Sequence, residues 1–172
     1  MKNPTLYIFS GLPGSGKSTL AKNLASDTGA VFIRIDTIEQ AVRDLCDFKV
    51  EGEGYRLSYR IALDNLALGN SVIADSCNPI ELTRQEWRDV AINARSNYID
   101  IEVKCSDVAE HKHRIETREQ EVPGLKPTTW QCVIDREFHP WESKRIVIDT
   151  AGRSIDESFQ ELILALNEHE NV

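Results

Sequence analysis

Nine residues near the N-terminus have the types and spacing that hold a nucleoside triphosphate. The stretch GLPGSGKST (11–19) matches the pattern G-x-x-x-x-G-K-[S/T]. Its glycines let backbone N–H groups turn toward phosphate oxygens, and a helix that begins near Lys17 adds its positive end. Lys17 would reach the β- and γ-phosphates, and the Ser18 hydroxyl would bind Mg²⁺. We expect every residue of the loop to contact the nucleotide: Gly11, Leu12, Pro13, Gly14, Ser15, Gly16, Lys17, Ser18 and Thr19.

Two aspartates follow apolar stretches that have the composition of buried strands. Asp36 ends the stretch VFIRID, where a carboxylate would take the proton of an attacking hydroxyl and hold Mg²⁺ through water. Asp36 would also suit the N-cap of the next helix, and the two roles are compatible. Asp75 ends SVIAD (71–75), where a second Mg²⁺ partner belongs, although a simple turn before Pro79 would explain it too. The predicted metal ligands are therefore Ser18, Asp36 and Asp75.

Two arginines stand four residues apart, just before a polar segment. Arg114 and Arg118 would share one face of a helix, and EQEVPGLKP (119–127) follows them. Such a pair suits a closing lid that neutralises a transferring phosphoryl group and excludes water. A solvated face paired with neighbouring glutamates is the alternative. The predicted catalytic residues are Lys17, Asp36, Arg114 and Arg118.

The stretch VIDTAGR (147–153) contains the D-x-x-G pattern with which regulatory GTPases sense the γ-phosphate. Here it lies near the C-terminal end of the sequence, only one predicted helix follows it, and no N-K-x-D motif stands downstream to bind guanine. A GTPase is therefore not favoured. We expect this segment to pack on the nucleotide base, with Thr150, Gly152 and Arg153 as nucleotide-binding residues together with Arg114.

Apolar runs and amphipathic stretches alternate along the chain, which predicts β-α-β units around a parallel sheet. The fold class is then a three-layer α/β/α fold, in which ligands bind at the carboxyl ends of the strands. That edge is where the glycine loop, the two aspartates and the DTAG segment would meet. We predict strands at 5–9, 31–35, 71–75, 99–103 and 145–149, and helices at 17–28, 37–46, 55–69, 80–96, 107–119 and 154–169.

Composition limits the class of protein further. The 172 residues are 41% hydrophobic with a net charge of −8, which suits a single domain over 1–172 with a lid at about 114–130. No run approaches the ~18 apolar residues of a membrane span, and the N-terminus has no signal-peptide pattern, so we expect a cytoplasmic protein. The four scattered cysteines are expected to be reduced thiols in or near the core. Such an acidic chain is expected to be a poor binder of long nucleic acid.

The order of these motifs resembles that of the small P-loop kinases that phosphorylate hydroxyl groups. This group includes polynucleotide kinase, chloramphenicol phosphotransferase, gluconate kinase, shikimate kinase and adenylylsulfate kinase. The resemblance implies a P-loop NTPase fold with five parallel strands in the order 2-3-1-4-5, Asp36 as the base, and Arg118, with Arg114, as the lid arginine. It covers nearly the whole chain and rests on GLPGSGKST (11–19), IRID (33–36), VIADSCNP (72–79) and HRIETR (113–118).

Two departures from that group narrow the function. Several of these kinases have a second carboxylate two residues before the base, and here that position is Arg34. The lid also lacks the dense arginine pattern of adenylate kinases, so a nucleoside monophosphate acceptor is not favoured. We therefore predict an ATP- and Mg²⁺-dependent phosphotransferase for a small-molecule hydroxyl. The alternatives are a polynucleotide or nucleoside 5′-hydroxyl kinase, and a nucleotide-binding regulatory protein or hydrolase without an acceptor.

The acceptor pocket is expected under the stretch DLCDFKVEGEGYRLSY (44–59), whose aromatic and basic residues would bind a sugar, a polyol, a base or a phosphorylated metabolite. Alternatively, Tyr55 and Tyr59 simply pack on a helix. FHPWES (138–143) would wall the lid or the base site. The identity of the acceptor, GTP as the donor, and a monomer or a homodimer all stay open.

Overall fold

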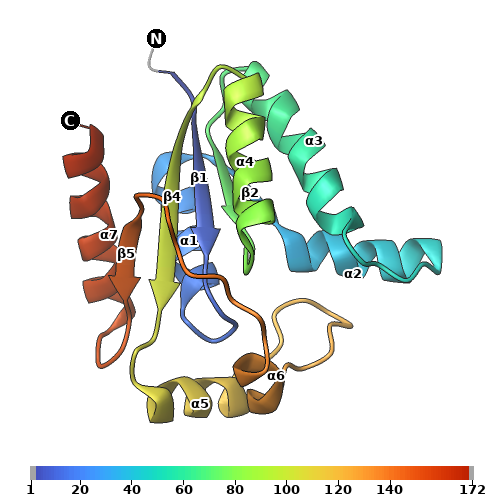
Figure 1. Cartoon of the computed structure of the whole chain (residues 1–172), viewed down its shortest axis with the longest axis vertical. Coiled ribbons are helices and arrows are strands. Elements are labelled where there is room, and N and C mark those ends of the chain that lie inside the picture. The colour runs from blue at the N-terminus through green and yellow to red at the C-terminus, as the bar shows by residue number, and fades with distance from the viewer. Residues whose placement is uncertain (1–2, 171–172) are drawn as a thin grey trace.

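The computed structural model describes residues 3–170 and contains a five-stranded sheet with seven helices in that range (Figure 1). The strands are β1 (Thr5–Ser10), β2 (Val31–Arg34), β3 (Val72–Asp75), β4 (Asn97–Lys104) and β5 (Ile146–Asp149). The helices are α1 (Lys17–Thr28), α2 (Ile35–Cys46), α3 (Glu53–Ala67), α4 (Glu81–Asn93), α5 (Val108–Thr117), α6 (Trp130–Ile134) and α7 (Ile155–Glu170).

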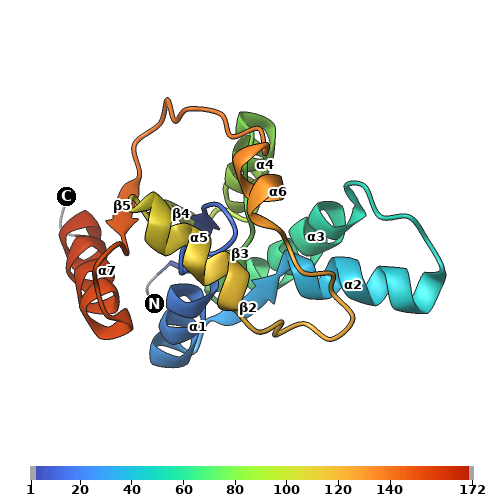
Figure 2. The same ribbon diagram turned by 90° about the horizontal axis from the view of Figure 1, so that it is seen from below.

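All four strand pairings are parallel, and the order β2-β3-β1-β4-β5 confirms the predicted P-loop NTPase topology. Helices α1 and α7 cover one face of the sheet, while α3 and α4 cover the other (Figures 1 and 2). Because both faces are covered, alternate side chains of β1 enter different cores. Leu6 and Ile8 pack toward α3 and α4, and Phe9 packs toward α1 and α7.

The strand register brings the predicted site residues to one edge. Asp75 at the end of β3 lies opposite Phe9 of β1 on one side and Arg34 of β2 on the other. Helices α5 and α6 lie beyond this edge, across the end of the sheet (Figures 1 and 2). The carboxyl ends of the strands therefore face α5 and α6.

The end of β2 differs from the prediction. The strand stops at Arg34, and Ile35 already belongs to α2, so Asp36 lies in the first turn of that helix and neither ends the strand nor caps the helix. Ile35 is 4% exposed and packs in the core beneath α3 and α4, which lets the chain turn into the helix at once. The positive end of α2 favours a carboxylate at this position.

The structure bears on two expectations drawn from composition, and it corrects the one about the placement of the cysteines. Within residues 3–170, no helix is both long and apolar enough to cross a bilayer. All four cysteines are free, but Cys46 and Cys132 are exposed, and only Cys105 is buried.

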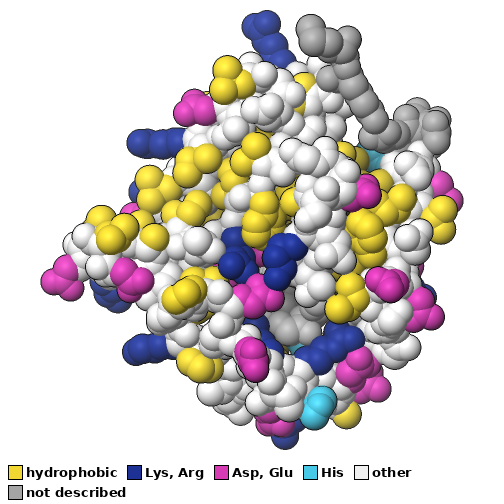
Figure 3. Space-filling model, turned by 180° about the vertical axis from the view of Figure 1, so that it is seen from behind, with side chains coloured by type: hydrophobic (Ala, Val, Ile, Leu, Met, Phe, Trp, Pro, Cys, Tyr) yellow, Lys and Arg dark blue, Asp and Glu magenta, His cyan; other side chains and the backbone are white. Residues whose placement is uncertain are grey.

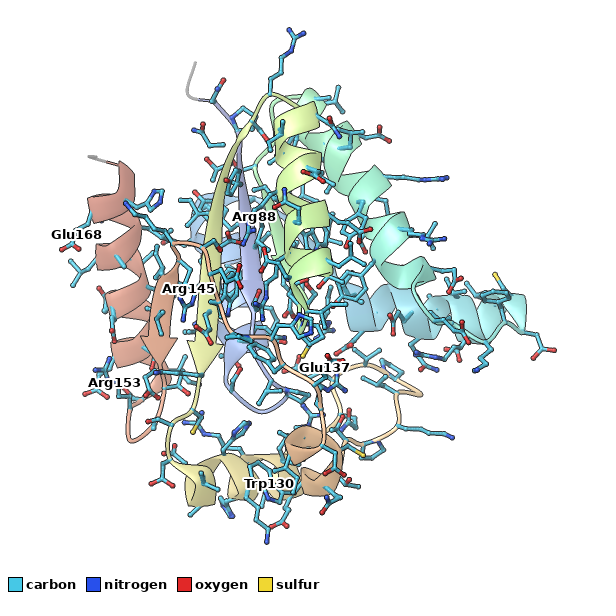
Figure 4. The ribbon with its side chains drawn as sticks, viewed as in Figure 1. Arg88, Trp130, Glu137, Arg145, Arg153 and Glu168 are labelled. Carbon is cyan, nitrogen blue, oxygen red and sulfur yellow. The ribbon has the colours of Figure 1, made fainter. Side chains whose placement is uncertain are left out.

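The stretch FHPWES is part of a segment, residues 137–143, that we call the strap. The strap packs on Arg84 of α4, whose side chain is fully buried and whose guanidinium lies 4.0 Å from the ring centre of Trp141. Arg88 holds the far end of the strap through the Ser143 hydroxyl at 2.6 Å and points from α4 toward the sheet (Figure 4). Arg84 donates to four carbonyl oxygens: Asn78 (3.0 Å), Pro79 (3.3 Å), His139 (2.9 Å) and Pro140 (3.3 Å).

The Arg84→Met variant is expected to lose about 3 kcal/mol of unfolding free energy. A methionine of similar length fills the space but leaves buried carbonyl oxygens without donors, which costs about 1–3 kcal/mol for a group left unsatisfied. Urea unfolding followed by circular dichroism measures the change. Arg60→Met, at an exposed site of α3, is the matched control and should stay within about 0.5 kcal/mol of the wild type. Equal stability of both variants would contradict the role of Arg84.

Candidate active site

The loop between β1 and α1 is tightly enclosed by its neighbours. Gly11 has φ 150°, and a Cβ there would clash with the carbonyl oxygen of Val103. Gly14 has φ 80°, and its Cβ would lie 2.7 Å from Cδ1 of Ile115. The N–H of Gly11 also donates to the carbonyl oxygen of Cys77 at 3.1 Å. Larger residues at these two glycines would displace the loop, so the backbone is held in the shape that the motif predicts.

Lys17 at the start of α1 is held by a buried carboxylate. Its Nζ lies 2.7 Å from Oδ1 of Asp75, which is 1% exposed, and 3.3 Å from Oγ of Ser18. Burial acts to lower the pKa of Lys17, but the charge and hydrogen bond of Asp75 outweigh it, so the pKa is raised above its usual value. Asp36 adds to that rise, which places its charge near Lys17. Lys17 is thus a cation that Asp75 holds in place.

The surroundings of Lys17 fit a magnesium ion with few protein ligands. Oδ2 of Asp75 is buried and has no hydrogen-bond partner among the described residues, as expected of an oxygen that faces a cation or its bound water. The described residues contain no cluster of three His, Cys, Asp or Glu side chains that could hold a metal by itself. Mg²⁺ commonly keeps several waters and binds one or two carboxylates plus substrate phosphates. Ser18 and Asp75, with Asp36 reached through water, are suited to that role.

A pocket of about 590 Å³ lies over the loop and continues past Lys17 to α2. Asp75 is not part of its lining because that residue lies buried behind Lys17. Gly152 is also absent from the lining, and its N–H donates to Glu110 at 2.8 Å. The other predicted site residues all line this pocket: Gly11, Leu12, Pro13, Gly14, Ser15, Gly16, Lys17, Ser18, Thr19, Asp36, Arg114, Arg118, Thr150 and Arg153.

The two predicted lid arginines differ in their surroundings. Arg114 is fixed: its guanidinium donates to Oγ1 of Thr150 at 2.7 Å and to Glu110 at 2.5 Å. The Thr150 hydroxyl in turn donates to the carbonyl oxygen of Ser15 at 2.8 Å, so Arg114 fastens α5 to the loop. Arg118 follows the last residue of α5 with an extended backbone (ψ 141°) and is exposed at the pocket. The helical face that the spacing predicts therefore ends before Arg118.

Helices α5 and α6 are attached to the outer side of the loop. Nε2 of His111 lies 2.7 Å from the carbonyl oxygen of Pro13, and the His111 ring meets the edge of Trp130, with 5.2 Å between ring centres. Trp130 lies at the start of α6, beside α5 (Figure 4). These contacts support the segment between the two helices.

That segment, residues 118–129, is what we call the lid, and it is folded down onto the pocket. Glu121 accepts hydrogen bonds from Lys22 of α1 at 2.8 Å and from Arg34 at the end of β2 at 2.7 Å. These bonds, first from Lys22 and then from Arg34, lower the pKa of Glu121 despite its partial burial. Val122 next to it is only 6% exposed. The lid thus covers the pocket from the side of α1 and β2.

The predicted acceptor region at 44–59 does not line the pocket. Its two tyrosines pack instead, as in the alternative interpretation. The Tyr55 hydroxyl accepts the N–H of Asn78 at 3.2 Å, and Tyr59 donates to Glu86 at 2.9 Å and meets the edge of Trp87. Burial raises the pKa of both tyrosines. The loop between α2 and α3 extends away from the sheet (Figure 1).

The side of the pocket beyond Lys17 is formed by residues that the motifs did not predict. Glu39 lies one helical turn after Asp36 on α2, Cys77 follows the end of β3, and Arg136 follows α6. The spacing of Asp36 and Glu39 would have suggested that both acids face one side. No sequence pattern marks Arg136, because only the packing of the strap brings it to this pocket.

The lining is basic although the chain is acidic. Basic side chains gather around a hollow near the middle of the face in Figure 3, with an acidic one between them. Arg153 is one of the basic lining residues, in the loop between β5 and α7, and it pairs with Glu161 (Figure 4). The lining includes seven cations, Lys17, Arg34, Arg114, Arg118, Lys126, Arg136 and Arg153, against four acids, Asp36, Glu39, Glu119 and Glu121. A strongly anionic ligand fits this balance.

Comparison with known proteins agrees with the loop and the sheet. Residues 6–129 match the model of a family described as an AAA domain. An APS kinase of Mycobacterium tuberculosis, solved with AMPPNP and APS, is 20% identical with a TM-score of 0.71, covering 97% of this chain and 99% of its own. Kti12 of Chaetomium thermophilum, solved with ADP-AlF3, is 20% identical with a TM-score of 0.69, over 94% and 97%. A gluconokinase of Sinorhizobium meliloti is 16% identical with a TM-score of 0.67, over 99% of each chain.

Proposed function

The chain belongs to the AAA-domain family whose model matches residues 6–129, and from that membership and the pocket we propose that it is an ATP-dependent phosphotransferase. In this proposal the γ-phosphate of ATP passes to a hydroxyl of a small molecule. The fold shared with an APS kinase and a gluconokinase supports this class of reaction. The nucleotide analogues with which two of those proteins were solved, AMPPNP and ADP-AlF3, support a nucleotide ligand.

The observation that carries the proposal is the continuity of the pocket from the glycine loop to Asp36. A nucleotide on the loop would direct its last phosphate past Lys17, toward α2. The cavity does not stop there but continues along Asp36, Glu39 and Cys77. A hydrolase needs room for one water molecule only. A second half of the pocket that contains a carboxylate suits an acceptor with a hydroxyl group.

Each group of residues in the pocket has its own role in the proposed transfer of the phosphoryl group. The N–H groups of the loop and Lys17 stabilise the negative charge of the transferring phosphoryl group, and Arg118 at the base of the lid adds a further cation. Asp36 orients the acceptor hydroxyl and takes its proton. Ser18 and Asp75, with Asp36 through water, would hold Mg²⁺, which would supply further charge neutralisation on the phosphates. The lid excludes water, which is the competing acceptor.

Release of ADP in the presence of candidate acceptors tests the function directly. We expect slow release from ATP and Mg²⁺ alone, and a rise of about 10²-fold with the correct hydroxyl compound, because binding places the hydroxyl in line with the phosphate. The panel should include sugars, polyols, hydroxy acids, nucleosides and 5′-hydroxyl oligonucleotides, with ATP and GTP compared as donors. Slow hydrolysis that no acceptor stimulates would favour a hydrolase or a regulatory protein instead.

A further inference from the structure

Arg136 lies on the acceptor side of the pocket, near Asp36. The Arg136 guanidinium lies within hydrogen-bonding range of the Cys77 side chain. Arg136 also acts on Glu39, the second acid of α2. Arg136, Asp36, Glu39 and Cys77 all line the same cavity. The guanidinium and the proposed base therefore line one cavity, together with Cys77.

The charge of Arg136 is not neutralised by a carboxylate among the described residues. Arg34, Arg114 and Arg153, the other arginines of the pocket apart from Arg118, each have an acidic partner within 4 Å. Glu39 pairs with Arg43 at 3.0 Å and not with Arg136. A cation that lines a cavity without a carboxylate partner is available to a ligand.

The bound nucleotide does not need this cation. Its phosphates would be accommodated by the loop, Lys17 and Arg118, whereas Arg136 lines the pocket together with residues of α2 and those that follow β3. The hydroxyl of Ser76, which is 3% exposed, lines the cavity next to Cys77. A guanidinium and a hydroxyl are both good donors to an anionic oxygen.

We infer that the acceptor is a small anionic hydroxy compound whose carboxylate, sulfate or phosphate group binds Arg136 while its hydroxyl faces Asp36. The inference rests on the proposed phosphotransferase function, which it makes more specific. The acceptor is small because one guanidinium in the pocket, on a chain of net charge −8, does not provide the several phosphate contacts of a long nucleic acid.

Cys77 allows the anion site to be tested without any acceptor or turnover. Iodoacetate and iodoacetamide both react with a thiolate, whose sulfur bonds to the CH₂ carbon as iodide leaves, and they differ mainly in charge. The ratio of their rates therefore reports the local field and is independent of how much thiolate is present. Mass spectrometry gives this ratio for each cysteine, with exposed Cys46 and Cys132 as internal references. We expect the ratio at Cys77 to exceed the references by about tenfold at low salt.

Two variants test whether Arg136 causes the preference of Cys77 for iodoacetate. Arg136→Gln should lower the ratio at Cys77 toward the reference value, whereas Arg153→Gln, at the other end of the pocket, should leave it unchanged. Molar salt should reduce the preference as well, because exposed charges are screened. A ratio at Cys77 equal to the references, or one that Arg136→Gln does not change, would overturn the inference.

Matched acceptors separate this inference from the proposed function. ADP release is compared within three pairs of compounds: glycerate with glycerol, gluconate with glucose, and a sugar phosphate with its free sugar. The first two pairs test a carboxylate, and the third tests a phosphate. We expect the anionic member to have a KM at least tenfold lower, and Arg136→Gln to raise that KM. Preference for the neutral member, or for an oligonucleotide, would overturn the inference while leaving a kinase. A high ratio at Cys77 without phosphorylation of any acceptor would instead refute the proposed function and leave the anion site.

Discussion

Replacement of Asp36 by Asn is expected to lower acceptor phosphorylation by about 10³-fold while the Kd for ATP changes less than about twofold. An amide keeps the size of the side chain and can still accept a hydrogen bond, but it cannot take a proton at neutral pH. General-base catalysis by a carboxylate is typically worth about 10²–10⁴-fold. ATP binding depends on the loop and Lys17, which the substitution does not touch. Single-turnover transfer and calorimetric ATP binding, measured on the same preparation, give the two quantities.

The control for this variant is Asp44→Asn. Asp44 is an acid of the same helix, accepts a hydrogen bond from Gln40 and does not line the pocket. It should retain the wild-type rate. Asp36 contributes at most about 1 kcal/mol to α2 through the helix dipole, so a thermal melt should show little change. If Asp36→Asn retained most of the transfer rate, the assignment of Asp36 as the base would be wrong.

The second large effect is expected from Lys17→Ala, which should weaken ATP binding by at least tenfold and lower the rate of transfer by about 10²–10³-fold. In the proposed function the ammonium group is the cation that the loop places against the β- and γ-phosphates, and preorganised charge of this kind acts mainly on the transition state. The same substitution leaves the buried Asp75 without its partner. We therefore expect a loss of stability as well, of about 2–3 kcal/mol, because an unpaired buried charge is costly.

A double variant separates these two effects. Lys17→Ala combined with Asp75→Asn removes the unpaired charge, so the unfolding free energy should recover by about 2 kcal/mol. Activity should not recover, since the cation is still missing. Lys17→Arg, which keeps the charge but not the compact ammonium, is the conservative comparison. Recovery of activity in the double variant would mean that Lys17 acts only by stabilising the fold.

The fold could be predicted from local sequence patterns, because apolar runs and amphipathic stretches alternate along the whole chain. Each apolar run became a strand within a few residues of its predicted bounds, and the amphipathic stretches between them became the covering helices. A parallel sheet has to bury both faces, so this alternation leaves few arrangements open. The errors lie where tertiary packing decides a boundary. Ile35 enters the core and starts α2 early, and the short helix α6 was not predicted.

The site was predictable where one short stretch of backbone provides it. The glycine loop, Lys17 and Ser18 form a local structure, and Asp36 and Thr150 closely follow two strands whose ends the topology brings to one edge. The acceptor side was not predictable in this way. Phe48 and Tyr55 are aromatic residues of the kind that line binding sites, and they suggested the stretch 44–59 as the acceptor region. The loop between α2 and α3 instead extends away from the sheet, and the Tyr55 hydroxyl is bonded to the N–H of Asn78.

The sequence by itself therefore determined the donor side of this protein: a phosphate-binding loop after the first strand, an aspartate after the second and a parallel sheet that brings them together. Only the tertiary structure decided the acceptor side. Arg136 follows Asp36 by a hundred residues and reaches the same cavity because Arg84 holds the strap against α4. Arg114, expected in a moving lid, is instead fixed to Thr150. Contacts between segments so far apart depend on side-chain packing, which no spacing within a motif encodes.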